Sequence, residues 1–468
     1  MGDRLVLRWM PSVLLLGLFG WVAARTARPI SDPDDWWHLR LGNDLIAQHS
    51  LSTPGHWSSF ATLSWVPTEP LPEVVSAYVE RWFGLPGLAV LFSAVLAMVV
   101  LVVQLTNRRH AALLPATLAT VLTVLAASPS LSARPQLFSF ALVPIVLAAW
   151  LQTERDLKAR WWLVPLIWLW SLCHGFWIFG VAFGFLFVVG IALSRRADVR
   201  TLVQLAGVAV ASLGVVALNP VGLGVLEAPF AVQSTSQYIS EWERTDLLRA
   251  GPLGAVLMIV ATAVIWAVTR QGVSWSRLLL LVVAAFLVWY AARLVVIGGL
   301  VAAPLFAGAL DALVARSSGA AEPASRTSRF ELLTGALGAV ACVAFVVVVA
   351  PQVADEPGDV PVALDAQLDG LPPGTPVFNT YAVGGWLTWR HPDLEQYIDG
   401  LVTPYSLPHV RDYVRADAIG AGWYRVVLDS HAPVALLGSH TALAAALEGK
   451  GWTNDGTSNG YVLLRRPT

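Results

Sequence analysis

The sequence predicts an all-α polytopic membrane protein with about 11 transmembrane helices and a small C-terminal extracytoplasmic α/β domain. Of its 468 residues, 56% are hydrophobic and 13% are charged, whereas a soluble domain carries about 25% charged residues. So few charges leave too little polar surface for several water-facing domains. The chain also has 21 tryptophans, and Trp suits the membrane interface because its ring is apolar and its N–H stays hydrated.

About eleven apolar runs approach the roughly 20 residues that a spanning helix needs. They centre on 9–24, 86–106, 111–128, 136–152, 161–173, 176–194, 201–218, 252–269, 277–292, 294–314 and 332–350. The first run resembles a signal peptide, but in a multispanning protein we expect an uncleaved anchor. The fifth run is short and meets the sixth at 171–175, which indicates a tight turn near one membrane face.

Lys and Arg residues distinguish the two sides of the membrane. One side collects Arg4, Arg8, Arg108, Arg109, Arg155, Lys158, Arg160, Arg195, Arg196, Arg200, Arg270, Arg277, Arg316, Arg326 and Arg329. The other side, before residue 351, collects Arg25, Arg28, Arg40, Arg81, Arg134, Arg244, Arg249 and Arg293. Because short cytoplasmic loops are enriched in Lys and Arg, we expect a cytoplasmic N-terminus. An odd number of spans then makes the C-terminus extracytoplasmic.

This topology predicts a transmembrane domain over 1–350, including a first outer loop at 25–85, and an extracytoplasmic α/β domain over 351–468. The first outer loop reads as two amphipathic helices, about 34–48 and 71–82, around a Ser/Thr/Pro-rich loop. A second long outer segment is 219–251, where Asn219-Pro220 is a turn signal. The stretch 316–330 reads as a flexible cytoplasmic linker.

The C-terminal region has the rhythm of a soluble α/β domain. Expected strands are 377–379, 385–389, 396–398, 424–428 and 461–464, and expected helices are 408–416 and 441–450. Gly384-Gly385 suits a sharp turn between two strands. Roughly 110 residues can bury a small core of their own.

The densest polar cluster lies just outside the first span. Asp32, Asp34 and Asp35 fall within four residues, and crowded carboxylates need a cation, a metal or a proton. The adjacent Trp36 and Trp37 offer flat apolar faces for a sugar ring or an isoprenoid chain. Alternatively, the acids cap a helix and favour its dipole while the Trp residues anchor the interface. Both interpretations can hold at once.

Other ionisable residues lie beside the outer ends of spans. Glu69 and Glu73 either begin an ordinary amphipathic helix or bring Glu69 beside the acidic cluster. His38 and His174 can both reach an outer-face cavity, although a lone His174 also fits a hydrogen-bonded structural residue. Glu241 is either a ligand-facing acid or a solvated one.

Two arginines stand at the outer ends of spans, Arg134 before Pro135 and Arg293 after a Trp-Tyr-Ala-Ala stretch. A charge at membrane depth is costly and tends to be functional. A lipid phosphate is a natural counter-ion, because the planar guanidinium fork matches phosphate oxygens. The alternative is that the side chains extend to the lipid headgroups.

Several classes of function are disfavoured. The sequence contains no nucleotide-binding loop, zincin motif or Ser-nucleophile elbow, and a net charge of -1 gives no indication of nucleic-acid binding. Cys173 and Cys342 lie in apolar runs, which argues against a disulfide framework or a cysteine metal site.

The motifs together resemble a group of bacterial polytopic membrane proteins that are similar to the GT-C fold glycosyltransferases, which use polyprenyl-phosphate sugars. The resemblance spans nearly the whole chain. It is carried by DPDDWWHLRLG at 32–42, WVPTE at 65–69, RPQLFSF at 134–140, HGFW at 174–177, NPVG at 219–222, SEWE at 240–243 and NTYAVGGW at 379–386.

This resemblance implies an inverting transferase in the bacterial plasma membrane. Asp34 or Asp35 would be the general base or a metal ligand, with Mg²⁺ or Mn²⁺ as the metal, and Arg293 or Arg134 would bind the lipid phosphate. Trp36, Trp37, His38, His174 and Glu241 are candidate substrate-binding residues. The chain departs from the family pattern at Pro67-Thr68-Glu69: the family has a His or Asn before the Glu, and this chain has Thr68. Glu69 is therefore a metal candidate only because of its position in the sequence.

The partners implied are membrane lipids, a polyprenyl-phosphate-linked sugar and an envelope glycan, lipid or protein acceptor. The C-terminal domain would close over the site or present the acceptor. Two alternatives remain. A lipid-linked substrate transporter or flippase would need charged or broken helices near the bilayer midplane, whereas the ionisable residues here cluster at span ends. A non-catalytic scaffold in envelope assembly would be favoured by degenerate acids, yet all three aspartates are present.

Overall fold

The structure is a computed structural model that describes residues 2–53, 56–226, 240–318 and 328–467. The described residues form two compact units. Unit 1 comprises 2–27, 90–226 and 240–349, and unit 2 comprises 28–89 and 350–467. The flexible linker predicted at 316–330 falls mainly on 319–327, and much of the segment 219–251 falls on 227–239; both stretches lie outside the described residues.

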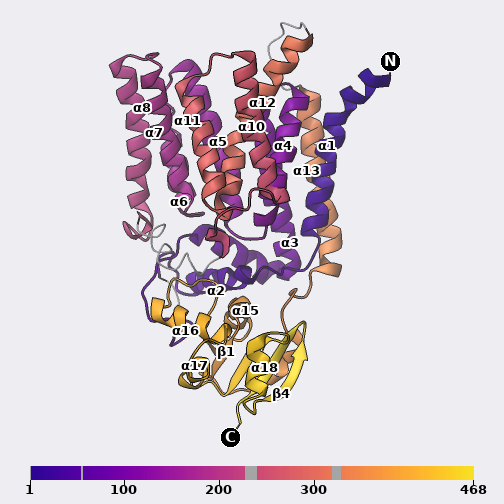
Figure 1. Cartoon of the computed structure of the whole chain (residues 1–468), viewed down its shortest axis with the longest axis vertical. Coiled ribbons are helices and arrows are strands. Elements are labelled where there is room, and N and C mark those ends of the chain that lie inside the picture. Colours follow the sequence, from indigo (N-terminus) through magenta and orange to yellow (C-terminus); the bar gives the residue numbers. More distant parts are fainter. Residues whose placement is uncertain (1, 54–55, 227–239, 319–327, 468) are drawn as a thin grey trace. The chain divides into compact units, whose positions relative to one another are not determined.

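Unit 1 is a bundle of helices that run side by side (Figure 1). These are α1 (Gly2–Thr26), the C-terminal part of α3 (Pro70–Arg108), α4 (Leu113–Ala127), α5 (Gln136–Asp156), α6 (Leu163–Ser171), α7 (Trp177–Leu193), α8 (Val199–Gly214), α10 (Ala250–Thr269), α11 (Trp275–Tyr290), α12 (Val295–Ser318) and most of α13 (Arg329–Val353). Short 3-10 turns at Ser128–Ser130 (η1), Val215–Leu218 (η2), Ser240–Trp242 (η5) and Ala292–Leu294 (η6) join several of them.

The bundle confirms a helical membrane protein. Each of the eleven expected apolar runs lies on a helix, and eight described helices are long and apolar enough to cross a membrane. Two shorter apolar helices, α7 and α11, extend this set. The short fifth run forms only the nine residues of α6, or about 14 Å of helix.

Small residues allow the helices of unit 1 to pack closely around α12. A Cβ placed on Gly298 of α12 would lie 2.8 Å from the carbonyl oxygen of Ala284 in α11. A Cβ on Gly254 of α10 would lie 2.9 Å from the carbonyl oxygen of Leu122 in α4. Such close backbone approach is typical of helix contacts in membranes, where van der Waals packing replaces the hydrophobic effect.

Unit 2 contains the first outer loop. Helix α2 (Pro33–Ala47) matches the expected helix at 34–48, and α3 begins at Pro70, one residue before the expected start. Gly84 interrupts α3 with a φ of 64°, a conformation that glycine adopts without steric cost. The interruption separates the amphipathic first part of α3 from its apolar continuation in unit 1.

The rest of unit 2 is a five-stranded mixed sheet with short helices (Figure 1). Its strands are β1 (Pro376–Asn379), β2 (Glu395–Gln396), β3 (Val434–Gly438), β4 (Thr453–Ser458) and β5 (Tyr461–Arg465), in the order β2-β1-β3-β5-β4. β1 pairs in parallel with β2 and β3, and β5 pairs antiparallel with β3 and β4. The helices are α14 (Asp365–Asp369), α15 (Tyr381–Arg390), α16 (Leu407–Asp417), α17 (Trp423–Asp429) and α18 (Ala442–Glu448).

Two expected strands are helices instead. Residues 385–389 belong to α15, and the Gly pair lies inside this helix rather than in a turn. The reason is close packing: a Cβ on Gly384 would lie 2.0 Å from the carbonyl oxygen of Ile398, and one on Gly385 would lie 2.7 Å from that of Pro33 in α2. Residues 424–428 form α17, which begins after Gly422 at a φ of 80°.

Two strands were not predicted from the sequence. β3 is entirely apolar and lies at the centre of the sheet, with all but its last residue buried. β4 has the polar sequence TNDGTS and forms an edge of the sheet, so it carries no alternation of apolar residues. The expected strands at 377–379 and 461–464 and the helices at 408–416 and 441–450 correspond to β1, β5, α16 and α18, whereas the strand expected at 396–398 shares only Gln396 with the two-residue β2.

Candidate functional site

The acidic cluster forms the N-terminus of α2 in unit 2. Asp32 is the N-cap, and its Oδ1 accepts a hydrogen bond of 3.0 Å from the backbone N–H of Asp34. Asp34 and Asp35 occupy the first helical turn, where the positive end of the helix dipole favours carboxylates. Asp35 is buried, with 6% of its surface exposed. The capping interpretation of Asp32 is therefore correct, and it fixes the orientation of the next two acids.

Asp34 lies against the loop that follows β2. A Cβ on Gly400 would come within 2.1 Å of Asp34 Oδ1 and 3.1 Å of Trp37 Nε1. Asp399 anchors this loop: its carboxylate accepts hydrogen bonds from Tyr405 Oη, Gln396 Nε2 and the Leu401 backbone N–H, at 3.0, 3.0 and 2.9 Å. Burial raises the pKa of the Asp399 carboxyl group, and these hydrogen bonds oppose the shift.

The two tryptophans of α2 have different environments. Trp36 is completely buried and stacks on Trp389 of α15, with ring centroids 5.0 Å apart. Trp37 is half-buried, and its ring centroid lies 3.5 Å from that of His38. Trp36 therefore packs α2 against α15, whereas Trp37 lies between His38 and the Gly400 loop and keeps part of its surface accessible.

His38 joins two glutamates of the α3 N-terminus. Its Nδ1 lies 2.9 Å from Glu73 Oε1, and its Nε2 lies 3.7 Å from Glu69 Oε2. Helices α2 and α3 approach closely here, since a Cβ on Gly42 would lie 2.1 Å from the carbonyl oxygen of Glu73. All three side chains offer a ligand atom within 4.8 Å of the others. We call His38, Glu69 and Glu73 the His–Glu cluster.

The His–Glu cluster has the donor chemistry of a metal centre. Glu73 is 1% exposed, and its Oε2 is buried without a hydrogen-bond partner in the part of the chain that is described. One imidazole and two carboxylates suit Zn²⁺ or Mn²⁺ better than Mg²⁺, which prefers oxygen ligands alone. Of the predicted metal ligands Asp34, Asp35 and Glu69, only Glu69 belongs to this cluster.

Sequence analysis missed Glu73 as a candidate ligand and assigned His38 to substrate. One signal was present: Glu69 and Glu73 are four residues apart, and the Glu73 N–H donates to the Glu69 carbonyl oxygen at 3.3 Å. Residues at this spacing lie on one face of a helix. The partner His38 comes from a different helix, 35 residues away from Glu73, so no local pattern identifies it.

The two predicted arginines meet at one carboxylate in unit 1. Arg134 Nη1 donates to Glu241 Oε1 and Arg293 Nη1 donates to Glu241 Oε2, each at 2.8 Å. Arg134 precedes α5, Arg293 lies in η6 and Glu241 lies in η5. The Ala292 N–H also donates to the carbonyl oxygen of Glu243 at 3.1 Å. These turns hold the two guanidinium groups around Glu241. We call Arg134 and Arg293 the arginine pair and Glu241 its bridging acid.

Aromatic groups surround the arginine pair. The Arg293 guanidinium lies 5.8 Å from the ring centroid of Phe176 and 5.9 Å from that of Trp242. His174 is buried; its Nδ1 accepts a hydrogen bond from the Phe176 N–H at 3.1 Å, and its ring meets the Phe176 ring edge-on. His174 thus fits the structural interpretation, and through Phe176 it supports Arg293.

The arrangement in unit 1 is suited to binding an anion. Two guanidinium groups converge on one position, and a carboxylate occupies that position. A phosphate group presents similar oxygens and more negative charge to the same donors. Arg293 is 25% exposed at its side chain and is held by Glu241, so it does not simply extend towards headgroups.

Comparison with known proteins identifies the fold. No protein-family model and no curated protein sequence matches the chain. The archaeal oligosaccharyltransferase AglB from Archaeoglobus fulgidus, in complex with an inhibitory peptide and a dolichol-phosphate, is similar with a TM-score of 0.55 at 13% identity, over 91% of this chain and 69% of that one. The same protein in complex with Zn and sulfate gives 0.52 at 15% identity, over 96% and 72%.

ArnT from Cupriavidus metallidurans, bound to undecaprenyl phosphate, is similar with a TM-score of 0.51 at 15% identity, over 97% of this chain and 99% of ArnT. The chain therefore has the fold of the GT-C glycosyltransferases, with a helical membrane part and a small C-terminal mixed sheet. At such low identity the similarity establishes the fold alone.

Proposed function

We propose that a chain with this GT-C fold transfers a sugar from a polyprenyl-phosphate donor to an acceptor hydroxyl on the extracytoplasmic face of the membrane. The observation that carries the proposal is the arginine pair, whose two guanidinium groups each lie 2.8 Å from an oxygen of Glu241. Such a pair is a preformed anion site at a helix end. AglB and ArnT are similar in fold, and their structures contain dolichol-phosphate and undecaprenyl phosphate.

In this mechanism Arg134 and Arg293 bind the phosphate of the donor, and Glu241 yields its position to it. When the bond between the sugar C1 and the phosphate oxygen breaks, the electron pair stays on the phosphate. The two guanidinium groups stabilise this growing negative charge. Electrostatic stabilisation of this kind is usually the largest single contribution to lowering the reaction barrier. Phe176 and Trp242 place apolar rings beside Arg293, which lowers the local dielectric and thereby strengthens its interaction with the phosphate.

Asp34 or Asp35 acts as the general base. The acceptor oxygen forms its new bond to the sugar C1 from the face opposite the phosphate, which inverts that carbon, and its proton passes to the carboxylate. Asp34 is the better placed of the two to meet an acceptor, since it is half-buried, whereas Asp35 is buried. His38 and the partly exposed Trp37 contribute polar and flat apolar surface beside it.

A divalent metal fits the His–Glu cluster. His38, Glu69 and Glu73 would hold it, and the bound ion would supply positive charge and Lewis acidity next to α2. The ions expected from the sequence were Mg²⁺ or Mn²⁺, and the imidazole ligand favours Mn²⁺ or Zn²⁺. In the absence of metal, His38 bridges the two carboxylates and holds α2 against α3.

The test measures donor binding and transfer separately. Native mass spectrometry of the purified protein with undecaprenyl phosphate should show binding that falls about 10-fold or more in Arg134→Gln and Arg293→Gln, because each loses a charge-assisted hydrogen bond. Arg249→Gln is the matched control: Arg249 is exposed, pairs only with Asp246 in the described residues and lies at the same end of the bundle. Glu241→Gln should bind at least as tightly as the natural chain.

Transfer is followed as the envelope glycan made in cells that carry only the variant chain. Asp34→Asn or Asp35→Asn should abolish the product while leaving undecaprenyl phosphate bound. If both variants leave the product unchanged, the base assignment is wrong, and a transporter or a non-catalytic scaffold becomes the better interpretation. Equal binding in the Arg293, Arg134 and Arg249 variants would reject the phosphate site.

A further inference from the structure

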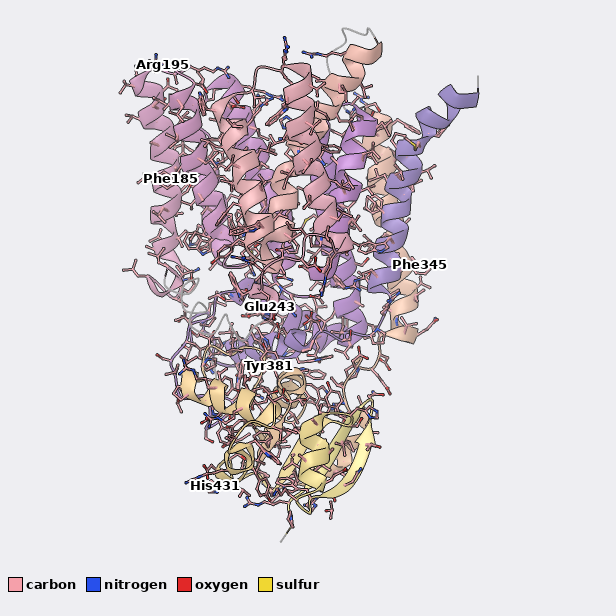
Figure 2. All side chains as sticks on the ribbon, viewed as in Figure 1. Phe185, Arg195, Glu243, Phe345, Tyr381 and His431 are labelled. Atoms are coloured by element: carbon pink, nitrogen blue, oxygen red, sulfur yellow. The ribbon has the colours of Figure 1, made fainter. Side chains whose placement is uncertain are left out.

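A polar cavity lies at the end of the unit 1 bundle opposite to the arginine pair. It has a volume of about 170 Å³, and its polar lining consists of His110, Arg155, Gln271 and Arg277. Helix α5 runs between the two ends, from the arginine pair to Arg155, and its 21 residues span about 30 Å. Figure 2 labels Glu243 at one end of the bundle and Arg195 at the other. The cavity is therefore separate from the site proposed for the donor.

The lining of this cavity carries excess positive charge. Arg155 Nη2 donates to His110 Nδ1 at 2.8 Å, and Arg155 forms no ion pair within the described ranges. Arg277 Nε lies 3.2 Å from Glu154 Oε2, and Glu154 also accepts a hydrogen bond from Ser274. Glu154 is thus the one carboxylate near both guanidinium groups in the described residues, and it is already held by Arg277 and a hydroxyl.

His110 carries no negative charge that could offset the arginines, and its own pKa is lowered in this environment. Burial, followed by the neighbouring guanidinium groups of Arg155, Arg277 and Arg109, lowers the pKa of His110 to about 3. The imidazole is therefore neutral at physiological pH, which leaves Nδ1 free to accept the hydrogen bond from Arg155. The contribution of three guanidinium groups, beside the larger effect of burial, agrees with the positive charge of the lining.

The remaining walls are apolar. Leu151, Trp266 and Leu305 line the cavity, together with Gly308, which packs beside the backbone of His110. Apolar walls lower the local dielectric, so that an unpaired guanidinium is costly and an anion bound to it is held strongly. A single water needs only roughly 10–15 Å³, so the cavity has room for a larger group.

We propose that this cavity binds a phosphate group, carried by an anionic membrane lipid or by a soluble phosphate ester. Arg155 presents its planar fork to the phosphate oxygens, and Arg277 supplies the second charge. The bound group ties the end of α5, which carries Arg155, to the connection between α10 and α11, which carries Gln271, and to the first turn of α11, which carries Arg277. This proposal does not depend on sugar transfer.

The experiment compares two sources of phosphate on the purified full chain. In native mass spectrometry, the natural chain should retain phosphatidylglycerol in preference to phosphatidylcholine, and Arg155→Gln should reduce that retention about tenfold. In parallel, glycerol 1-phosphate is added and the rise in Tm is measured. A rise that disappears in Arg155→Gln indicates that phosphate alone suffices; lipid retention without this rise assigns the source to a lipid headgroup.

Arg196→Gln is the matched control, because Arg196 is exposed at the same end of the bundle and does not line the cavity. It should behave as the natural chain does in both measurements. Arg155→Lys keeps the charge and removes the fork, so it tests the site even where Arg155→Gln folds poorly, and it should bind more weakly than Arg. Equal lipid retention and equal Tm response in the natural chain, the Arg155 variants and Arg196→Gln would overturn the proposal.

Discussion

Glu73 is the residue on which the metal interpretation depends. It is almost fully buried, one of its oxygens contacts His38, and the other has no hydrogen-bond partner among the described residues. We expect the purified chain to contain close to one equivalent of Zn²⁺ or Mn²⁺ by elemental analysis. Glu73→Gln should reduce this content about tenfold or more, because an amide is a much poorer ligand than a carboxylate.

Glu80→Gln makes the same substitution on the same helix and should leave the metal content unchanged, because Glu80 is outside the cluster. A chain without metal under every condition, or equal loss in both variants, would reject the metal site. The cluster would then serve only to hold α2 and α3 together.

Single residues were predictable where their role is local. The cap by Asp32 follows from Asp-Pro at the start of an amphipathic run, and Arg134 and Arg293 were candidates because they stand at span ends. Their meeting through Glu241 was not predictable, because the three residues are 107 and 52 positions apart along the chain. No alternation or helical spacing connects residues so distant; only tertiary packing brings them together.

The element that controls Asp34 is the loop after β2. Because a Cβ on Gly400 would lie 2.1 Å from Asp34 Oδ1, Gly400→Ala must move that carboxylate. The collision involves the end of a side chain, so we expect little loss of stability, with Tm lower by less than about 4 °C. The glycan product should fall about 10- to 100-fold, since small displacements of a reacting group are costly.

Gly449→Ala is the comparison, because a Cβ there meets only ordinary contacts, the nearest at 3.4 Å, and both Tm and product should be unchanged. A Gly400→Ala chain with full product would show that the orientation of Asp34 does not matter. Asp35 would then be the remaining candidate for the base.

Helices and strands were predicted correctly where the spacing of apolar residues agrees with the residues that mark the ends of an element. The membrane helices follow from long apolar runs, since an unsatisfied backbone group in lipid is so costly that only helices or barrels survive there. The prediction failed at α15 and α17, which are short and contain adjacent apolar residues that resemble strands. Residues of α15 form a helix because of tertiary packing, since two glycines let this helix approach α2 and the Ile398 backbone closely.

At the scale of the whole molecule, the number of membrane crossings decides on which side of the membrane the N-terminus and the sheet domain lie. Among the described residues, the eight long helices and the two shorter apolar helices make ten candidate spans. We expect the nine-residue α6 to be an eleventh span, and its last residue, Ser171, accepts a hydrogen bond from Asn219, which follows η2 at the end of α8. With an odd number of spans we expect the N-terminus and the sheet domain on opposite sides of the membrane, and from the arginine-rich end of the bundle we expect a cytoplasmic N-terminus.

This topology predicts the accessibility of single cysteines to a membrane-impermeant maleimide. Thr457 is exposed on the edge strand β4, and Arg196 is exposed between α7 and α8. Thr457→Cys should react in intact spheroplasts, whereas Arg196→Cys should react only after the membrane is permeabilised. Cys173 and Cys342 are buried and should give little background. The reverse pattern would place the sheet domain in the cytoplasm, away from a donor on the outer face, and sugar transfer on that face would then have to proceed without it.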